Sequence, residues 1–198
     1  MYFVLVAGGP GTGKTTIVNG LASRLRSLGY RVYVIRDWAR EIIRREMERS
    51  GRVLPWVDRR LFEYEVLKHH LEEYRRVLAL SSRIDVVVED GGPFAAKAYC
   101  DVDGVPVPEL YNEALKYVDM IDLVVLTDTP KSYAKDSERW EDLGYALKIH
   151  RAIVELHMQL FRGRTVVSPY EDSPSRRVEK LLSVISPRLE RMCGDVLR

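Results

Sequence analysis

Short apolar segments alternate along the chain with longer stretches in which apolar residues recur at three- and four-residue steps. The five apolar segments are almost continuous in hydrophobic residues, as in strands buried on both faces, and lie at residues 2–7, 31–36, 85–88, 122–127 and 165–168. The stretches between them have the spacing of helices with one buried face. Strands that alternate with helices predict an α/β fold in which helices cover both faces of a parallel sheet.

The longest predicted helix covers about residues 58–82. Its apolar positions predict a buried stripe formed by Leu61, Tyr64, Leu67, Leu71, Tyr74 and Leu78. Pro187 is expected to interrupt the last predicted helix, because proline lacks the backbone N–H and its ring clashes with the preceding turn. The length of 198 residues, without an internal repeat or a linker, predicts a single domain over residues 1–198.

A glycine-rich segment, residues 8–15, connects the first predicted strand with the first predicted helix. It fits the phosphate-loop pattern G-x-x-x-x-G-K-[ST], in which glycines let consecutive backbone N–H groups point at one anion. Lys14 is expected to reach the β- and γ-phosphates of a nucleotide, and the Thr15 hydroxyl is expected to bind Mg²⁺. The expected nucleotide-binding residues are Gly9, Gly11, Thr12, Gly13, Lys14, Thr15 and Thr16. The required order of strand, loop and helix predicts a nucleoside-triphosphate site; the alternative is a glycine-rich turn that binds nothing.

Acidic residues follow three of the predicted strands. Asp37 comes after the second strand, Glu89 and Asp90 end the third, and Asp128 follows the fourth. Ligands of open α/β sheets bind at the carboxyl ends of the strands, so we expect these acids near the phosphates, where Mg²⁺ is bound and a hydroxyl is activated. The alternative is that they cap the helices that follow, and Asp128 fits this alternative best.

Composition and charge argue against several other classes of protein. The chain is 46% hydrophobic and 30% charged, and no apolar run approaches the length of a membrane span. The N-terminus enters a strand at once, and the two cysteines are isolated, so we expect a cytoplasmic protein with reduced thiols. The net charge of +2 gives no overall signature of nucleic-acid binding.

The amide residues and the histidines add smaller indications. Asn and Gln are scarce beside many Lys, Arg and Glu, which is typical of a protein from a hot environment. The four histidines lack the spacing of metal ligands, and we interpret them as surface or packing residues.

Several motifs follow one another in an order found in a known family. The phosphate loop is followed by residues 36–41, by residues 88–91 with 98–100, and by residues 136–139. From Phe3 to about Leu182 this arrangement resembles the small P-loop kinases related to ribosylnicotinamide kinase, deoxynucleoside kinases and thymidylate kinase, which are often classified with AAA-type ATPase domains. The resemblance implies a three-layer P-loop NTPase fold with a five-stranded parallel sheet and a mobile lid at about residues 131–142. It also implies transfer of the γ-phosphoryl group of ATP, with Mg²⁺, to a small acceptor.

The same resemblance implies roles for individual residues. Lys14 would stabilise the transferring phosphoryl group, and Thr15 would hold Mg²⁺. Asp37 lies at the position of the carboxylate that activates the acceptor hydroxyl, and Glu89 at a position near the metal or that hydroxyl. Arg139 matches a lid arginine that approaches the phosphates. The choice of base between Asp37 and Glu89 stays open.

One position departs from the family pattern. Asp90 stands where an arginine commonly steadies an acceptor phosphate, which disfavours a phosphorylated acceptor. The arginine-rich stretch 36–60 could replace that arginine or receive a nucleic-acid end. The alternative is a solvated face in which these arginines pair with Glu41, Glu46 and Glu48.

The sequence thus predicts an ATP- and Mg²⁺-dependent phosphotransferase that acts on a small hydroxyl-bearing acceptor, such as a nucleoside, a nucleotide or a related metabolite. An ATPase or regulatory switch acting on a protein partner and a kinase of nucleic-acid ends are the alternatives. A GTPase is disfavoured because no Asn-Lys-x-Asp motif is present, and a ring-forming AAA motor because the chain is short. We expect no membrane partner, and a homodimer stays open.

Overall fold

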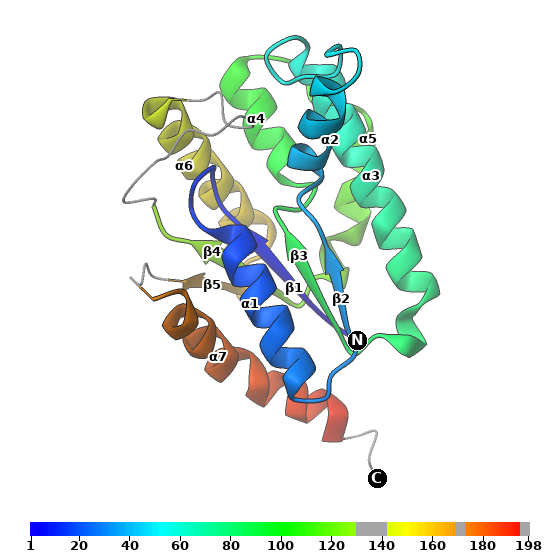
Figure 1. Cartoon of the computed structure of the whole chain (residues 1–198), viewed down its shortest axis with the longest axis vertical. Coiled ribbons are helices and arrows are strands. Elements are labelled where there is room, and N and C mark those ends of the chain that lie inside the picture. Colours follow the sequence, from blue (N-terminus) through cyan, green and yellow to red (C-terminus); the bar gives the residue numbers. More distant parts are fainter. Residues whose placement is uncertain (130–141, 169–172, 195–198) are drawn as a thin grey trace.

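Five parallel strands form one sheet at the centre of the protein (Figure 1). The computed structural model describes residues 1–129, 142–168 and 173–194, with side chains as far as residue 190. The strands are β1 (Tyr2–Ala7), β2 (Val32–Ile35), β3 (Val86–Asp90), β4 (Leu123–Thr127) and β5 (Thr165–Ser168), and they lie in the order β2-β3-β1-β4-β5. The predicted five-stranded parallel sheet is confirmed. Its order places β1, which leads into the glycine loop, between β3 and β4.

Helices connect the strands, and a last helix follows β5. They are α1 (Lys14–Ser27), α2 (Trp38–Met47), α3 (Arg59–Ala79), α4 (Ala95–Asp103), α5 (Leu110–Ala114), α6 (Leu143–Leu160) and α7 (Pro174–Gly194), with short 3-10 turns η1 (Ser81–Arg83) and η2 (Leu115–Met120). Among the residues that the structure describes, none of the helices is long and apolar enough to span a membrane.

The expected interruption at Pro187 is wrong, because α7 continues through this residue. Pro187 lies on the exposed side of the helix, whereas Ile185 and Leu189 on either side of it are buried in the core. Most helical stability in proteins comes from tertiary packing of the apolar face. Packing on both sides of Pro187 therefore holds the helix together across the missing N–H.

The pleat of the strands separates two hydrophobic cores. Tyr2, Val4 and Val6 of β1 face one side of the sheet, where α1 and α7 pack together. Phe3 and Leu5 face the other side, which α3, α4 and α6 cover. The glycine loop and the start of α2 lie at the same end of this sandwich, beyond the carboxyl ends of β1 and β2 (Figure 1). The fold therefore gathers the predicted site residues of these loops at one edge.

The buried face of α3 differs from the predicted stripe. Leu67, Leu71 and Tyr74 are buried as expected, but Leu61, Tyr64 and Leu78 are among the exposed hydrophobic residues. Their places are taken by Phe62, Glu63, Val66, His70 and Val77, which are all buried. These residues also have helical spacing, but two of them are polar. The pattern of apolar residues alone therefore predicts a buried face that is rotated about the helix axis from the observed one. As a consequence, α3 turns polar side chains toward the interior.

His157 on α6 provides a test of the packing on the α3–α4–α6 side. Its Nδ1–H donates a hydrogen bond of 2.8 Å to the Ile153 carbonyl, and its ring packs against Phe94 and Phe161. Nε2 is buried and has no hydrogen-bond partner among the described residues. Burial lowers the pKa of His157 to about 4, so the folded protein holds the neutral ring at pH values where the unfolded chain is already protonated.

We predict that wild type loses stability relative to a His157→Phe variant as the pH falls. The unfolded imidazole takes up a proton near pH 6.5, whereas the folded one does so only near pH 4, so the loss falls in this window. It reaches up to about 3 kcal/mol, the free-energy equivalent of the difference between the two pKa values. Urea unfolding of both proteins at pH 7, 5.5 and 4 measures it. A stability difference that does not vary with pH would contradict a buried neutral His157.

Candidate functional site

The glycine loop has a backbone that only glycine adopts readily. Gly8, Gly11 and Gly13 have φ values of 154°, 76° and 83°. A Cβ atom on Gly8 would lie 1.9 Å from Oγ1 of Thr127, so the loop also fits tightly against the end of β4. Helix α1 begins directly after the loop at Lys14, and the amino end of a helix presents free N–H groups and a positive dipole end to an anion.

Side chains of the loop itself bind its backbone. The Lys14 ammonium donates a hydrogen bond of 3.0 Å to the Gly9 carbonyl, and the Thr12 hydroxyl donates one of 2.9 Å to the same oxygen. The loop residues from Pro10 to Thr16, together with Asp37 and Arg40, line an open pocket. All the predicted nucleotide-binding residues of the loop except Gly9 line this pocket, and Gly9 contributes the carbonyl that orients Lys14.

Two residues from the C-terminal half support the loop from behind. On α6, the buried Nδ1 of His150 accepts a hydrogen bond of 3.1 Å from the Gly9 N–H. On α7, the buried guanidinium of Arg177 donates to the Thr12 carbonyl at 3.2 Å and to the carbonyl and hydroxyl of Ser168. The sequence pattern predicts only a surface or packing role for His150 and gives no signal for Arg177. No local motif marks either residue, because only the fold brings them to the loop.

The two neighbouring acids at the end of β3 point in opposite directions. Oδ2 of Asp90 accepts a hydrogen bond of 2.7 Å from the Thr15 hydroxyl on α1. Glu89 is fully buried on the α3 side, where Oε2 accepts from the Tyr74 hydroxyl and Oε1 lies 2.8 Å from Nδ1 of His70. Consecutive strand residues face opposite sides of a sheet, so only one of the two can face α1. The structure therefore brings Asp90, and not Glu89, to the predicted metal residue Thr15.

The surroundings of Asp90 fit a Mg²⁺ ion. Its second oxygen, Oδ1, is buried and has no hydrogen-bond partner in the part of the chain that the structure describes. Burial and the negative charge of Asp37 raise the pKa of Asp90 to about 6, so a cation at this place would be favourable. Mg²⁺ prefers oxygen ligands and is commonly bound by one or two protein groups together with substrate phosphates. Thr15 and Asp90 supply such groups beside the loop.

Asp37 combines a capping role with a place in the site. Its Oδ1 accepts a hydrogen bond of 3.3 Å from the Arg40 N–H, which caps α2, and its Oδ2 lies 3.8 Å from Nε of Arg40. The capping alternative is thus observed, yet the same carboxylate lines the pocket at the glycine loop. Asp128 is exposed at the end of β4 and accepts a hydrogen bond from the Thr129 N–H.

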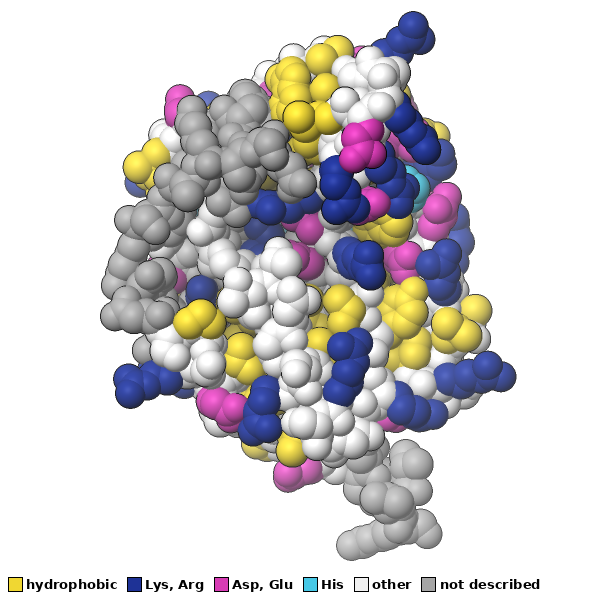
Figure 2. All heavy atoms as spheres, viewed as in Figure 1, with side chains coloured by type: hydrophobic (Ala, Val, Ile, Leu, Met, Phe, Trp, Pro, Cys, Tyr) yellow, Lys and Arg dark blue, Asp and Glu magenta, His cyan; other side chains and the backbone are white. Residues whose placement is uncertain are grey.

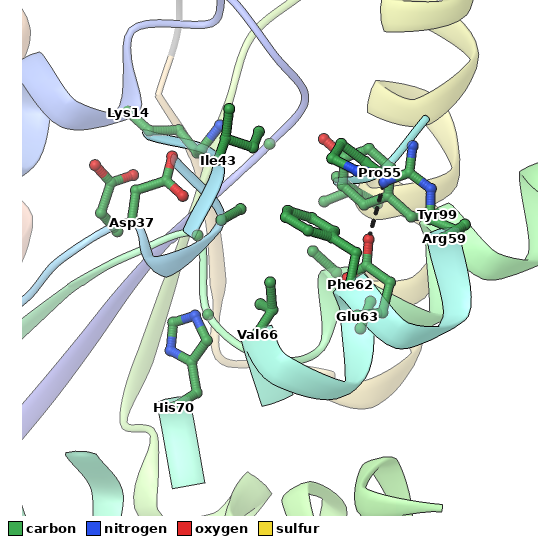
Figure 3. A pocket seen from close by; sticks show the side chains of 18 residues that line it. Lys14, Asp37, Ile43, Pro55, Arg59, Phe62, Glu63, Val66, His70 and Tyr99 are labelled. Carbon is green, nitrogen blue, oxygen red and sulfur yellow. Dashed lines mark hydrogen bonds and ion pairs between the residues drawn. The ribbon is translucent and has the colours of Figure 1, made fainter. Parts of the chain in front are cut away.

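A second pocket adjoins the first, between α2, α3 and α4 (Figure 3). The residues shared by the two pockets are Lys14, Asp37, Ala39, Ile43 and Tyr99. In Figure 3, Lys14 and Asp37 lie at one end of the second pocket, and Phe62 and Val66 lie between them and the opposite end. Four of the five buried α3 residues that the sequence pattern missed, all except Val77, therefore line this pocket.

Arg59 occupies the end of the second pocket that lies away from Lys14. Its guanidinium donates to Glu63 (3.1 Å), Asp103 (2.7 Å) and the Tyr145 hydroxyl (3.2 Å), and that hydroxyl donates to the other oxygen of Asp103. The guanidinium also lies over the rings of Phe62 and Tyr99. The sequence interpretation treated Arg59 only as one member of an arginine-rich stretch.

Other predicted site residues lie elsewhere. Residues 130–141, which include Arg139 and all but the last residue of the predicted lid, are outside the described residues. In the arginine-rich stretch, Arg44 and Arg45 pair with Glu41 on α2, as the ion-pair alternative expects. Figure 2 shows cationic side chains interspersed with acidic ones over this part of the surface.

We predict that the hydrogen bond between His150 and Gly9 stabilises the loop in its nucleotide-binding shape. Burial and the cationic Lys14 lower the pKa of His150, which keeps Nδ1 free to accept. A His150→Leu variant leaves the buried Gly9 N–H without a partner, at a cost of about 1–3 kcal/mol, and is expected to bind ATP about 5- to 100-fold more weakly. A His150→Asn variant, whose Oδ1 can accept the same bond, is expected to stay within about threefold of wild type. Calorimetric titration with ATP measures both, and equal affinities for the two variants would contradict the role of this bond.

We predict further that Asp90, and not Glu89, carries the dependence on Mg²⁺. The measured quantity is the ratio of ATP dissociation constants in EDTA and in Mg²⁺. An Asp90→Asn variant keeps an acceptor for Thr15 but removes the charge, so this ratio is expected to fall about tenfold or more. A Glu89→Gln variant serves as the matched control and is expected to keep the wild-type ratio. The opposite ranking of the two variants would overturn the placement of the metal.

The comparison with protein families agrees with this geometry. A family model described as an AAA domain matches residues 3–171, a range that contains the strands except for Tyr2 of β1, the glycine loop and the acids at its rim. No curated protein matches the chain. The match confirms the resemblance to small P-loop domains that the sequence motifs indicated. The chain belongs to the AAA domain family and is a nucleotide-binding domain of the P-loop NTPase type.

Proposed function

We propose that the protein is a phosphotransferase that moves the γ-phosphoryl group of ATP, in the presence of Mg²⁺, to a hydroxyl group of a small acceptor. The observation that supports this proposal best is the pair of adjoining pockets. In this proposal a nucleoside triphosphate occupies the pocket of the glycine loop, and the acceptor occupies the pocket of α3 and α4. Lys14 and Asp37 line both, at the place where a phosphoryl group would pass from one molecule to the other.

In the proposed reaction the acceptor oxygen attacks the γ-phosphorus and the bond to the β–γ bridging oxygen breaks, so that ADP leaves. Asp37 orients the acceptor hydroxyl and takes its proton, which later passes to water. Loop amides and the amino end of α1 hold the phosphates, and Lys14 neutralises charge on the transferring group. Mg²⁺, held by Thr15 and Asp90, would supply further positive charge at the phosphates. Most of the rate enhancement in such a reaction comes from positioning and electrostatics.

The surroundings of the two candidate bases favour Asp37 over Glu89. Both oxygens of Glu89 are engaged, by Tyr74 and by His70, and Glu89 does not line either pocket. Asp37 is partly exposed and lines both pockets. In this proposal Glu89 is a buried partner of α3, and Asp37 is the group that touches the acceptor.

An acceptor screen separates this function from its alternatives. The purified protein is incubated with ATP and Mg²⁺ without an acceptor, and then with nucleosides, nucleotides, nucleotide-like vitamins and oligonucleotides in turn. ADP formation that requires one of the small acceptors is the expected result. ADP formation at the same rate without an acceptor would favour an ATPase, and a requirement for oligonucleotides would favour a kinase of nucleic-acid ends.

We predict that an Asp37→Asn variant loses acceptor-dependent ADP formation by a factor of about 10²–10⁴, because the amide cannot accept the proton. The substitution keeps an oxygen that can cap α2, and the affinity for ATP is expected to stay close to that of wild type. Asp58→Asn is a matched control, because Asp58 caps α3 in the same way but lines neither pocket. Retained activity in Asp37→Asn, measured at saturating ATP, would remove Asp37 from the mechanism.

A further inference from the structure

The acceptor pocket contains a charged group at the end away from the phosphates that the transfer reaction does not use. Figure 3 shows Glu63 and Arg59, both on α3, on the opposite side of Phe62 and Val66 from Lys14 and Asp37. Side chains that are charged and buried in a protein normally have partners for all their polar atoms. The polar atoms at this end of the pocket that lack a partner in the protein therefore indicate which hydrogen-bonding group a bound molecule must carry.

Each nitrogen of the Arg59 guanidinium already donates to a group of the protein. Its Nε, Nη1 and Nη2 atoms donate to Asp103, Glu63 and Tyr145 respectively. Two carboxylates surround one guanidinium, so the cluster carries a net negative charge when both are ionised. A phosphate or carboxylate group of an acceptor would meet these acids instead of an available cation, and would be repelled.

Glu63 has one oxygen that is not engaged. Oε1 accepts the hydrogen bond from Arg59, whereas Oε2 has no hydrogen-bond partner among the described residues and is not completely buried. The residue is only 3% exposed and lines the pocket, so the small surface that it keeps lies at the pocket. Burial raises the pKa of Glu63 to about 7, which reflects the cost of keeping this charge in the interior. A hydrogen-bond donor from a bound molecule would lower that cost.

We propose that Oε2 of Glu63 accepts a hydrogen bond from the bound acceptor and selects its chemical class. The selected molecules are small and unphosphorylated, and they carry the reacting hydroxyl at one end and an N–H or O–H donor at the other. Between these ends the pocket offers Ile43, Phe62 and Val66, which suit an apolar or aromatic body. This inference rests on the proposed function, because it takes Asp37 as the group at the reacting end.

Matched pairs of probes test the inference. Adenosine and purine riboside have the same shape but differ by the exocyclic amino donor, and cytidine and its analogue without the amino group form a second pair. Binding of each probe is measured by equilibrium dialysis in the presence of a non-hydrolysable ATP analogue, and transfer is measured with ATP. For at least one pair, we expect wild type to prefer the donor-bearing member by about 10- to 100-fold, the range for a hydrogen bond to a charged group.

The Glu63→Gln variant supplies the decisive comparison. Its amide can keep an oxygen toward Arg59 and then turns an N–H group toward the pocket, so the preference within the pair is expected to disappear or reverse. A purely structural defect would weaken both members alike and would also lower the melting temperature and the affinity for the ATP analogue. Glu72→Gln, the same change on the exposed side of α3, is the control and is expected to keep the wild-type preference.

Failure of this inference and failure of the proposed function give different results. Equal use of both members of every pair by wild type, an unchanged preference in Glu63→Gln, or no binding of any of these probes would overturn the role of Glu63. Selective binding of donor-bearing probes without any transfer from ATP would support Glu63 as a recognition residue and would refute the phosphotransferase.

Discussion

The parallel pairing of β1 with β3 is the constraint on which the site depends. In this register Leu5 lies opposite Glu89 and Val6 lies opposite Asp90, so the acids end beside the glycine loop. The pleat then sends Asp90 toward Thr15 on α1 and Glu89 into the core against α3. Since a shift of one residue in the register turns every side chain to the other face, it would exchange the two carboxylates. The same strand register therefore fixes both the position of the Asp90 carboxylate and the packing of the hydrophobic core.

The nucleotide loop is held by parts of the chain that are distant in sequence. Gly9 and His150 lie 141 positions apart, and Arg177 of α7 reaches the Thr12 carbonyl from the other side of the loop. Each buried hydrogen bond contributes about 0.5–1.5 kcal/mol, and loss of one partner costs more, because the other group is left unsatisfied. The C-terminal helices thus do more than cover the sheet, since they preorganise the loop amides that would receive phosphate.

Local patterns in the sequence were sufficient to predict the sheet and the glycine loop, because both depend on residues that are close together in the sequence. The continuous apolar segments predicted all the strands, and the glycine and lysine spacing predicted the loop. The choice between Glu89 and Asp90 depended on which face of β3 meets α1, and strand periodicity alone does not contain that information. The pocket residues Glu63 and His70 were missed because a buried polar residue on a helix breaks the apolar stripe that marks its buried face.

The central claim is that one site brings a nucleotide and a second small molecule to Lys14 and Asp37. It is tested most directly by following the label of [γ-³²P]ATP in a reaction that contains only the purified protein, Mg²⁺ and a mixture of small hydroxyl-bearing acceptors. The account predicts that the label moves to an acceptor in the same amount as ADP forms. Label that appears only as inorganic phosphate, or remains in ATP, would contradict it.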